Sequence, residues 1–519
     1  MRARSPQVIS LLRYSPAMVA VLAVAASSNN IADIDLWGHL RFGADALARG
    51  HLFMRDPYAY SIPGLPWVSH EWLSEIVLAW MYAKLGVVGL KLVRFACAAA
   101  MVIFLAGAVG ETSAAIGIQL AALGLAVIAL MPEMEFRPQA FSYAMLSAVM
   151  WLIARDNYGR RAPLWIAIPM LALWCNLHGG FVIGLAALGI YTGWTAFIGL
   201  RERSGRARAL RLGAITGAAA VATLLTPYGL GAWRSVMRTI SRPPMINEIV
   251  EWKPLAATMV EIWHMPGFSF VFDCVIVIIL AALAVSVLIA PRGRDGGLLA
   301  IAGVMIAAAI SAFRNVPLAV IGSVTPLARH FALACGMVRA GASREAAGGM
   351  PRAHTNALTE SVLAMLAVVL AIWGGVFSRA MEMDFTFPAG AVAFMQQHRL
   401  AGNILCKFAW DDYVLYHRLP EDRVFLDTRY EMIYPDRIAR EYEDFYHGRA
   451  GAAGVLDGYR HDYVMLGPAA EANRLMRSRS DWVLIYRDRD SLLYARAGSA
   501  AAQIPGIPVT GTPPAPSFP

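Results

Sequence analysis

The feature that most constrains the fold is a series of long apolar segments. A helix that crosses a bilayer needs about 17–25 mostly apolar residues. We expect eleven such spans, at residues 12–28, 87–110, 114–131, 139–154, 163–176, 180–200, 210–226, 268–290, 297–312, 316–334 and 357–378. Of the 519 residues 58% are hydrophobic and only 16% are charged, whereas soluble domains carry about 25% charged residues. The expected fold class is therefore a polytopic α-helical membrane protein.

The basic loops predict the orientation of the chain, because cytoplasmic loops of membrane proteins are enriched in Lys and Arg. With eleven spans, every basic cluster falls on the cytoplasmic side. These clusters are Arg2, Arg4 and Arg13; Arg155, Arg160 and Arg161; Arg201, Arg203, Arg206, Arg208 and Arg211; Arg292 and Arg294; and Arg339, Arg344 and Arg352. We expect a bacterial inner-membrane protein with a cytoplasmic N-terminus. The net charge of +9 reflects this topology, and no nucleic-acid partner is expected.

This topology requires that residues 71–85 do not cross the membrane. Glu71, Glu75 and Lys84 interrupt the apolar residues of this segment. Such polarity favours an interfacial helix on the outer surface. Span 163–176 is short for a crossing, and a re-entrant pair of segments is the alternative there.

The predicted domains follow from this reading. Residues 1–378 form the transmembrane domain, with outer loops at 29–86 and 227–267. Residues 379–497 alternate strand-like and helical patterns, which is typical of an α/β domain, and we expect this domain to be periplasmic. The tail 498–519 is rich in Pro, Gly, Ala and Ser, and we expect it to be disordered.

The first outer loop holds the densest group of polar residues. Asp33 and Asp35 directly follow the first span. Two carboxylates this close can ligate a divalent cation such as Mg or Mn, or one can act as general base on an acceptor hydroxyl. Asp35 also precedes a helical pattern at 36–48, so helix capping is its alternative role. Further candidate binding residues of this loop are His39, Arg41, His70 and Glu71.

Other polar residues lie at the expected outer ends of later spans. They are Arg137, Gln139, Asn176, His178, Glu251 and Arg314. Each has a structural alternative, since arginines snorkel to headgroups and Asn or His residues cap turns. Two arginines near carboxylates and histidines at a membrane edge also suit a lipid phosphate.

Together these motifs resemble the GT-C superfamily of integral-membrane glycosyltransferases, which use polyprenyl-phosphate sugars. The first-loop motifs are Asp33-x-Asp35-Leu-Trp37-x-His39-Leu-Arg41, Asp56-Pro57-Tyr58 and Pro66-Trp67-x-x-His70-Glu71-Trp72. The later motifs are Arg137-Pro138-Gln139, Asn176-Leu-His178-Gly-Gly180, Thr226-Pro-Tyr228-Gly229, Gly402-Asn403, Asp411-Asp412-Tyr413, Val424-Phe-Leu-Asp427 and Asp462-Tyr-Val464. The likeness covers residues 29–496 and is most specific in the first loop.

The resemblance implies a carboxylate base after the first span, which is Asp35 or Asp33 here, with Asp35 favoured. It implies a sugar transfer from a polyprenyl-phosphate lipid donor to a glycan, lipid or protein acceptor at the outer face. The superfamily contains both metal-dependent and metal-independent enzymes. Two alternatives stay open: a transporter or flippase of lipid-linked glycans, and another membrane transferase that moves an acyl or phosphoethanolamine group.

Overall fold

The computed structural model describes residues 15–160, 162–201, 205–241, 250–263, 269–290, 295–337, 357–376, 378, 381–383, 386–504, 507–508 and 518. The chain divides into two compact units. The first unit contains Met1–Asn30, Val88–Gly229 and Ile246–Arg379. The second contains Ile31–Val87, Leu230–Met245 and Ala380–Pro519.

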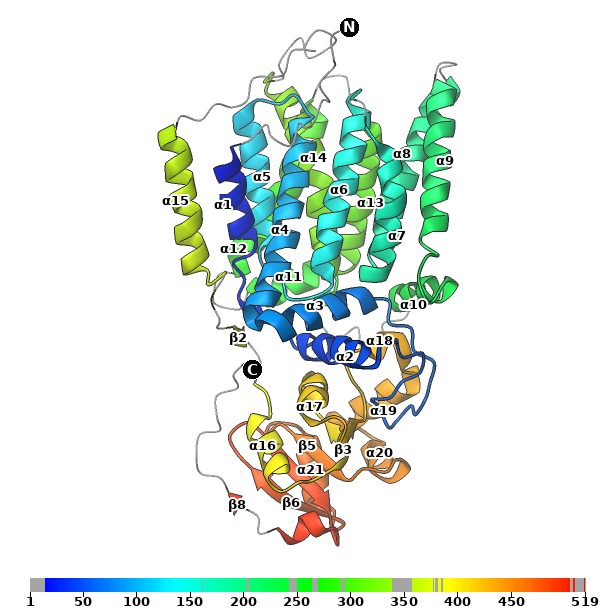
Figure 1. Cartoon of the computed structure of the whole chain (residues 1–519), viewed down its shortest axis with the longest axis vertical. Helices are drawn as coiled ribbons and strands as arrows, with labels where there is room; N and C mark the ends of the chain where they lie inside the picture. Colours follow the sequence, from blue (N-terminus) through cyan, green and yellow to red (C-terminus); the bar gives the residue numbers. More distant parts are fainter. Residues whose placement is uncertain are drawn as a thin grey trace. The chain divides into compact units, whose positions relative to one another are not determined.

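The first unit is a helical bundle whose long helices run side by side (Figure 1). Its helices are α1 (Pro16–Ala26), α4 (Val87–Gly110), α5 (Ile116–Leu130), α6 (Gln139–Asn157), α7 (Ala167–Leu177), α8 (Phe181–Arg201), α9 (Arg206–Ala222), α11 (Leu255–Trp263), α12 (Ser269–Ile289), α13 (Gly296–Ser311), α14 (Val316–Ala334) and α15 (Ala357–Trp373). Each of the eleven predicted spans overlaps one of these helices. The short span 163–176 corresponds to the 3-10 turn η2 (Leu164–Ile166) followed by α7.

Three helical stretches of the described chain are long and apolar enough to cross a membrane by length and composition. They are Val87–Gly110, Phe181–Gly199 and Phe313–Ala334. Six shorter apolar helices accompany them, among them Pro16–Ala26 and Gly296–Ser311. This architecture confirms the polytopic helical fold class. The number of crossings and the orientation of the chain remain predictions.

Several arginines of the predicted cytoplasmic loops form ion pairs with buried carboxylates of the bundle. Asp156 at the end of α6 lies 2.7 Å from Arg208 and 3.3 Å from Arg211. Glu111 after α4 lies 3.0 Å from Arg155 and 3.6 Å from Arg160. Arg201 ends α8 and Arg206 begins α9. The other basic residues of these clusters lie outside the described residues: Arg2, Arg4, Arg13, Arg161, Arg203, Arg292, Arg294, Arg339, Arg344 and Arg352.

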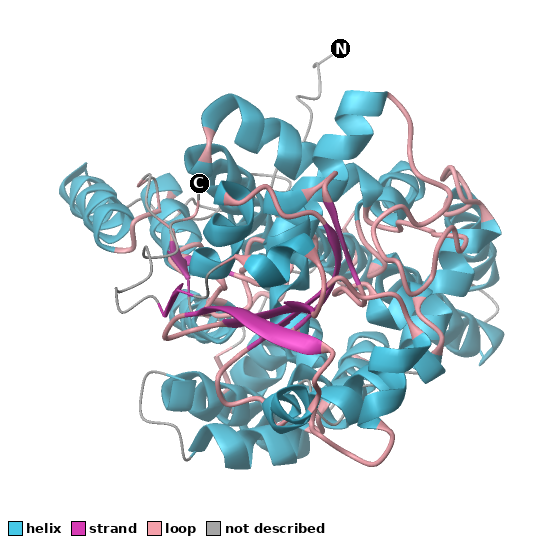
Figure 2. Ribbon diagram, turned by 90° about the horizontal axis from the view of Figure 1, so that it is seen from below, coloured by secondary structure: helices cyan, strands magenta, loops and turns pink. Residues whose placement is uncertain are grey.

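The second unit contains a six-stranded mixed sheet in the order β4-β3-β5-β7-β6-β8. Its strands, magenta in Figure 2, are β3 (Gly402–Cys406), β4 (Asp422–Val424), β5 (Tyr463–Leu466), β6 (Trp482–Arg487), β7 (Leu492–Arg496) and β8 (Ile507–Pro508). β3 pairs in parallel with β4 and β5, whereas β7 is antiparallel to β5 and β6. All four residues of β5 are buried, as expected of a strand between two neighbours with both faces covered. The predicted C-terminal α/β architecture is confirmed.

Helices connect and flank these strands. They are α16 (Ala389–Gln397), α17 (Asp411–Arg418), α18 (Tyr430–Ile433), α19 (Asp436–Tyr446), α20 (Ala452–Gly458) and α21 (Ala472–Ser478). α19 shows why such helices pack here: Ile438, Tyr442 and Phe445 recur at helical spacing and are all buried.

The segment that the sequence assigns to the first outer loop belongs by its contacts to this second unit. It contributes strand β1 (Ile31–Ala32), which pairs in parallel with β2 (Glu382–Met383). It also contributes α2 (Leu36–Arg49) and α3 (Trp72–Leu85), and α2 packs against both α3 and α17. Helix α10 (Leu230–Ser241) packs against α18. The predicted boundaries at residues 378 and 497 remain a prediction.

Part of the predicted disordered tail has a defined place in this unit. Residues Ala500–Gln503 form the 3-10 turn η7, and β8 pairs in parallel with β6. The ring of Phe518 lies 4.6 Å from the ring of Trp37. The other residues beyond Ile504 lie outside the described part of the chain.

Candidate functional site

Two carboxylates lie at the junction of β1 and α2. Asp33 follows β1 and is buried, and its main-chain carbonyl accepts the N–H of Leu36 at 3.2 Å. Its Oδ1 lies 3.5 Å from the main-chain nitrogen of Asp35. Asp35 occupies the N-cap position of α2, but its side chain makes no capping hydrogen bond. Its side chain therefore does not make the bond that defines the capping alternative.

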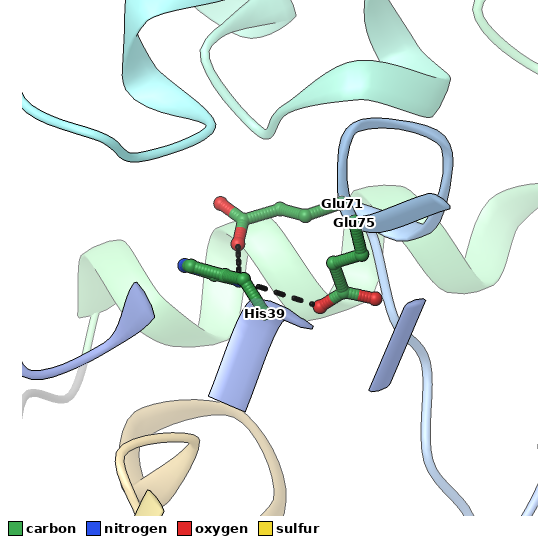
Figure 3. Close-up of side chains that lie close together, drawn as sticks. All are labelled: His39, Glu71 and Glu75. Atoms are coloured by element: carbon green, nitrogen blue, oxygen red, sulfur yellow. Dashed lines mark ion pairs between the residues drawn. The ribbon is translucent and has the colours of Figure 1, made fainter. Parts of the chain in front are cut away.

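A second acidic group joins α2 to α3. Nδ1 of His39 lies 3.6 Å from Oε1 of Glu75 and 4.0 Å from Oε2 of Glu71. Figure 3 shows the imidazole ring facing both carboxylates. His70 joins the group through its Nε2, 3.5 Å from Oε1 of Glu71. We call His39, Glu71 and Glu75 the His-Glu cluster.

The close crossing of α2 and α3 creates the His-Glu cluster. A Cβ atom at Gly43 would collide with the main-chain carbonyl of Glu75, so only glycine permits this approach. His39 lies one helical turn before Gly43, and Glu71 lies one turn before Glu75 on the opposing helix. Both glutamates therefore face the imidazole. Ser69 holds Glu75 from the other side by donating its hydroxyl to Oε2 at 3.0 Å.

The negative charges around His39 raise the pKa of its imidazole. Burial alone lowers the pKa of a histidine, but here Glu75 as a bonding partner and the negative charges of Glu71 and Asp35 outweigh it. The pKa of His39 rises from 6.5 to about 9. At neutral pH the imidazole of His39 is therefore protonated.

The same three residues have the donor set of a divalent-cation site. One ligand atom from each of His39, Glu71 and Glu75 can be chosen so that all lie within 4.8 Å of one another. One imidazole and two carboxylates suit Mn²⁺ or Zn²⁺. Such an ion would take the place of the proton on His39, because a ligating imidazole must be neutral. The predicted metal role of Asp33 and Asp35 is not tested by this geometry.

Arg41 does not join the His-Glu cluster. Its Nε lies 3.0 Å from Oδ2 of Asp45, one helical turn further along α2. Its Nη1 also donates to the main-chain carbonyl of Leu419 at 3.3 Å. These contacts tie α2 to the end of α17, and the binding role of Arg41 stays a prediction.

In the first unit, the structure brings together three other predicted residues. Glu251 lies in the 3-10 turn η4 (Val250–Trp252), between two arginines. Its Oε2 lies 3.4 Å from Nη1 of Arg137, and its Oε1 lies 3.7 Å from Nη1 of Arg314. Arg137 also pairs with Glu135 at 3.2 Å. We call Arg137, Glu251 and Arg314 the arginine bridge.

Short turns hold the arginine bridge in place. Arg314 lies in the 3-10 turn η5 (Phe313–Asn315), and the N–H of Phe313 donates to the carbonyl of Lys253 at 2.9 Å. The guanidinium of Arg314 stacks 4.1 Å above the ring of Trp252. Burial raises the pKa of the Glu251 carboxyl, but Arg314 and then Arg137 outweigh burial and lower it overall. The carboxylate thus stays ionised between the two arginines.

Asn176 and His178 hold the turn between α7 and α8. The Asn176 amide donates to the carbonyls of Ala172 and Leu225, at 2.8 and 2.9 Å. Nδ1 of His178 accepts the N–H of Gly180 at 2.9 Å and lies 2.6 Å from the hydroxyl of Ser142. These bonds are those of the turn-capping alternative. Gln139 begins α6, and its buried Oε1 accepts no hydrogen bond from the residues that the structure describes.

Two residues outside the predicted set stand out. Glu75 completes the His-Glu cluster, and its spacing of four residues from Glu71 on a predicted helix was an available signal. Arg94 is buried inside α4, with 2% of its surface exposed. A charged residue within an apolar span was the corresponding signal.

Comparisons with known proteins find similar solved structures but no matching family model. A scan against models of protein families finds no match, and a search of curated proteins finds none. Among solved structures, the chain is similar to the Archaeoglobus fulgidus oligosaccharyltransferase tethered with an acceptor peptide that contains the NVT sequon. The TM-score is 0.50 at 12% identity, over 93% of this chain and 74% of that chain.

A second similar structure is ArnT from Cupriavidus metallidurans bound to undecaprenyl phosphate. Its TM-score is 0.47 at 13% identity, and the match covers 93% of this chain and 97% of that chain. At such identities a structural match reports the fold. The match shows that the chain and the oligosaccharyltransferase have similar folds, in agreement with the fold that the sequence motifs lead us to expect.

Proposed function

We propose that the protein is a membrane glycosyltransferase that moves a sugar from a polyprenyl-phosphate donor to an acceptor at the outer face of a bacterial inner membrane. The observation that carries this proposal is the pair Asp33 and Asp35 next to the His-Glu cluster, on a chain with the GT-C fold. The acceptor is a glycan, a lipid or a protein. The similar oligosaccharyltransferase structure contains a tethered acceptor peptide, which supports a polypeptide as one possible class of acceptor.

In this proposal Asp35 acts as the general base. The acceptor hydroxyl loses its proton to the Asp35 carboxylate while its oxygen attacks the anomeric carbon of the donor sugar. The bond from that carbon to the phosphate oxygen breaks, and polyprenyl phosphate leaves with the electron pair. Inversion at the anomeric carbon follows from this single displacement. A phosphate is a good leaving group, so the enzyme needs a base and positive charge rather than an acid.

Each of the two units, taken by itself, offers a group that can supply positive charge to a phosphate. Arg137 and Arg314 present guanidinium groups, which match phosphate oxygens in a bidentate manner. A divalent cation held by His39, Glu71 and Glu75 would supply further electrostatic stabilisation of the leaving group.

Lipid extracts from cells with and without the gene test the proposal. We expect a polyprenyl-phosphate sugar to accumulate in the deletion strain, because its consumption is blocked. Complementation with the wild-type chain should remove this lipid, whereas complementation with Asp33→Asn/Asp35→Asn should not. An unchanged lipid profile in the deletion strain would contradict a transferase that consumes such a donor. Accumulation of a completed lipid-linked glycan would instead favour the flippase alternative.

A further inference from the structure

Arg94 lies on the buried face of α4. Leu90, Ala98 and Met101 lie one or two turns away on the same face, and none of them has more than 1% of its surface exposed. The helix itself is the most apolar candidate span of the described chain, with a mean hydropathy of 2.3. Arg94 begins the third turn of α4, roughly 10 Å along the axis from Val87. Its guanidinium is thus buried on an apolar face of the helix.

No acceptor in the described chain satisfies this guanidinium. Nε, Nη1 and Nη2 of Arg94 are buried and make no hydrogen bond. Among the described residues, the ring of Phe136 lies over the group, with its centroid 4.1 Å from the guanidinium carbon. A guanidinium carries five N–H donors, and a cation–π contact satisfies none of them.

The other buried arginines of the described chain form ion pairs with carboxylates. Arg418 pairs with Asp422, and Arg429 pairs with both Asp56 and Asp427. The arginine bridge is also compensated, because Glu251 lies between Arg137 and Arg314. Arg94 is therefore the buried guanidinium whose counter-charge the described residues do not supply. Burying an uncompensated charge is strongly unfavourable, so a ligand is the natural source of the missing anion.

The surroundings restrict what that anion can be. It must offer several acceptor oxygens to a planar fork of donors, as a phosphate does. It must also reach a residue inside an apolar span, so the remainder of the ligand must be apolar. Lys91 lies one turn before Arg94 and adds a second buried cation. Its Nζ donates to the Gly375 carbonyl and the Ser378 hydroxyl, both neutral acceptors, at 2.7 Å.

We propose that Arg94 binds the phosphate of a polyprenyl-phosphate lipid. This assignment rests on the proposed function. It adds Arg94, which is not part of the sequence motifs described above, to the donor-binding site. Phe136 supports the guanidinium from the α5–α6 connection and directly precedes Arg137 of the arginine bridge. The same connection therefore carries one arginine of the bridge and the aromatic support of Arg94.

Binding to the full-length protein in nanodiscs tests the proposal, with undecaprenyl phosphate, undecaprenol and inorganic phosphate as probes. Arg94→Gln should weaken undecaprenyl phosphate binding by about 10- to 100-fold, the value of charge-assisted hydrogen bonds. Binding of the neutral undecaprenol should not change. Arg94→Lys keeps the charge but loses the fork, so its affinity should be intermediate. Arg155→Gln is the matched control, since Arg155 also stacks on a tryptophan but pairs with Glu111; its affinity should equal that of the wild type.

The melting temperature without ligand separates binding from a structural role. Removing an uncompensated charge should leave the melting temperature of Arg94→Gln equal to or above that of the wild type. If Arg94 only supports the fold, the melting temperature falls and undecaprenyl phosphate binds normally, which overturns the proposal. Equal competition by inorganic phosphate overturns the lipid assignment. If Arg94→Gln does not fold, wild-type affinity in Arg94→Lys overturns the bidentate contact.

The lipid profile of the deletion strain tests the proposed function independently of the role of Arg94. A donor that accumulates there, together with normal binding by Arg94→Gln, removes Arg94 from the site and leaves the transferase intact. Failure of the wild type to bind undecaprenyl phosphate overturns the assignment of Arg94 whatever the lipid profile shows.

Discussion

Arg429 donates a hydrogen bond of 2.6 Å to Asp56, a residue 373 positions earlier in the chain. The guanidinium also pairs with Asp427 and lies 4.4–5.0 Å from the ring centres of Phe42, Tyr58 and Trp67. All of these residues belong to the second unit. This contact fastens the segment that carries Asp33, Asp35 and the His-Glu cluster to the sheet domain.

Loss of the Asp56 carboxylate should therefore destabilise the second unit. Asp56→Ala leaves Arg429 buried with part of its counter-charge removed, which typically costs about 3–5 kcal/mol of unfolding free energy. Chemical denaturation of the detergent-solubilised protein measures this loss. Arg437→Ala is the control, because its pair with Glu441 is 70% exposed on the arginine side and should contribute less than about 1 kcal/mol. Equal losses in the two variants would contradict the role given to Asp56.

Asp35→Asn separates the catalytic role of Asp35 from capping. Asparagine caps a helix about as well as aspartate, so expression and thermal stability should be unchanged. It cannot accept a proton, so turnover should fall about 10²–10⁴-fold. A sugar-transfer assay with membranes from the deletion strain measures this loss. Normal turnover would move the base role to Asp33, and normal turnover of the double variant would remove both residues from the mechanism.

Divalent-cation binding by the His-Glu cluster should strengthen as the pH rises. The pKa of His39 is about 9, so the imidazole must lose a proton when it ligates a metal at lower pH. Mn²⁺ affinity should therefore increase about tenfold per pH unit between pH 7 and 9. Titration of the wild type and His39→Ala with Mn²⁺ at several pH values measures this affinity. Binding that is independent of pH, or that survives in His39→Ala, would exclude His39 as a ligand.

In the absence of metal, the raised pKa of His39 predicts that the stability of the fold decreases as the pH rises. The folded-state pKa of His39 is raised from 6.5 to about 9, so the protonated imidazole stabilises the fold. Its contribution is complete below pH 6.5 and is lost as the pH rises through 9. Melting temperatures in the presence of a chelator should therefore decline over this interval more steeply in the wild type than in His39→Gln. Parallel pH curves for the two proteins would contradict the raised pKa.

Replacement of Arg137 or Arg314 by lysine tests the proposed phosphate contact. Each lysine keeps the ion pair with Glu251 but loses the planar fork of donors. We expect about a tenfold weaker affinity for the donor lipid with a nearly unchanged melting temperature. Wild-type affinity in both variants would identify the two arginines as structural partners of Glu251.

Cysteine labelling tests the predicted topology. Ala207 follows the start of α9 and Ser480 precedes β6, and both are exposed. With the native cysteines replaced by serine, a membrane-impermeant maleimide added to spheroplasts should label Ser480→Cys but not Ala207→Cys. Labelling of both or neither would contradict an N-terminus in the cytoplasm and a periplasmic sheet domain with eleven spans.

The sequence by itself determined the helices of the bundle, because hydropathy and helical length are local properties. The predicted span 87–110 coincides with α4, and the predicted helix 71–85 contains α3. The alternation of strand-like and helical patterns likewise predicted the α/β domain, since each strand is a short local run. Residues Asp33 and Asp35 could be singled out because they follow directly after a predicted span.

Only the tertiary structure decided which polar residues meet. Glu75 joins His39 because glycine at position 43 lets α2 and α3 cross closely, and Arg41 turns to Asp45 and Leu419 instead. Asp56 and Arg429 form an ion pair although they are far apart in sequence, whereas no described residue accepts a hydrogen bond from the Arg94 guanidinium. Pairing of charges depends on distances between elements far apart in sequence. Local patterns carry no information about those distances, whereas packing fixes them.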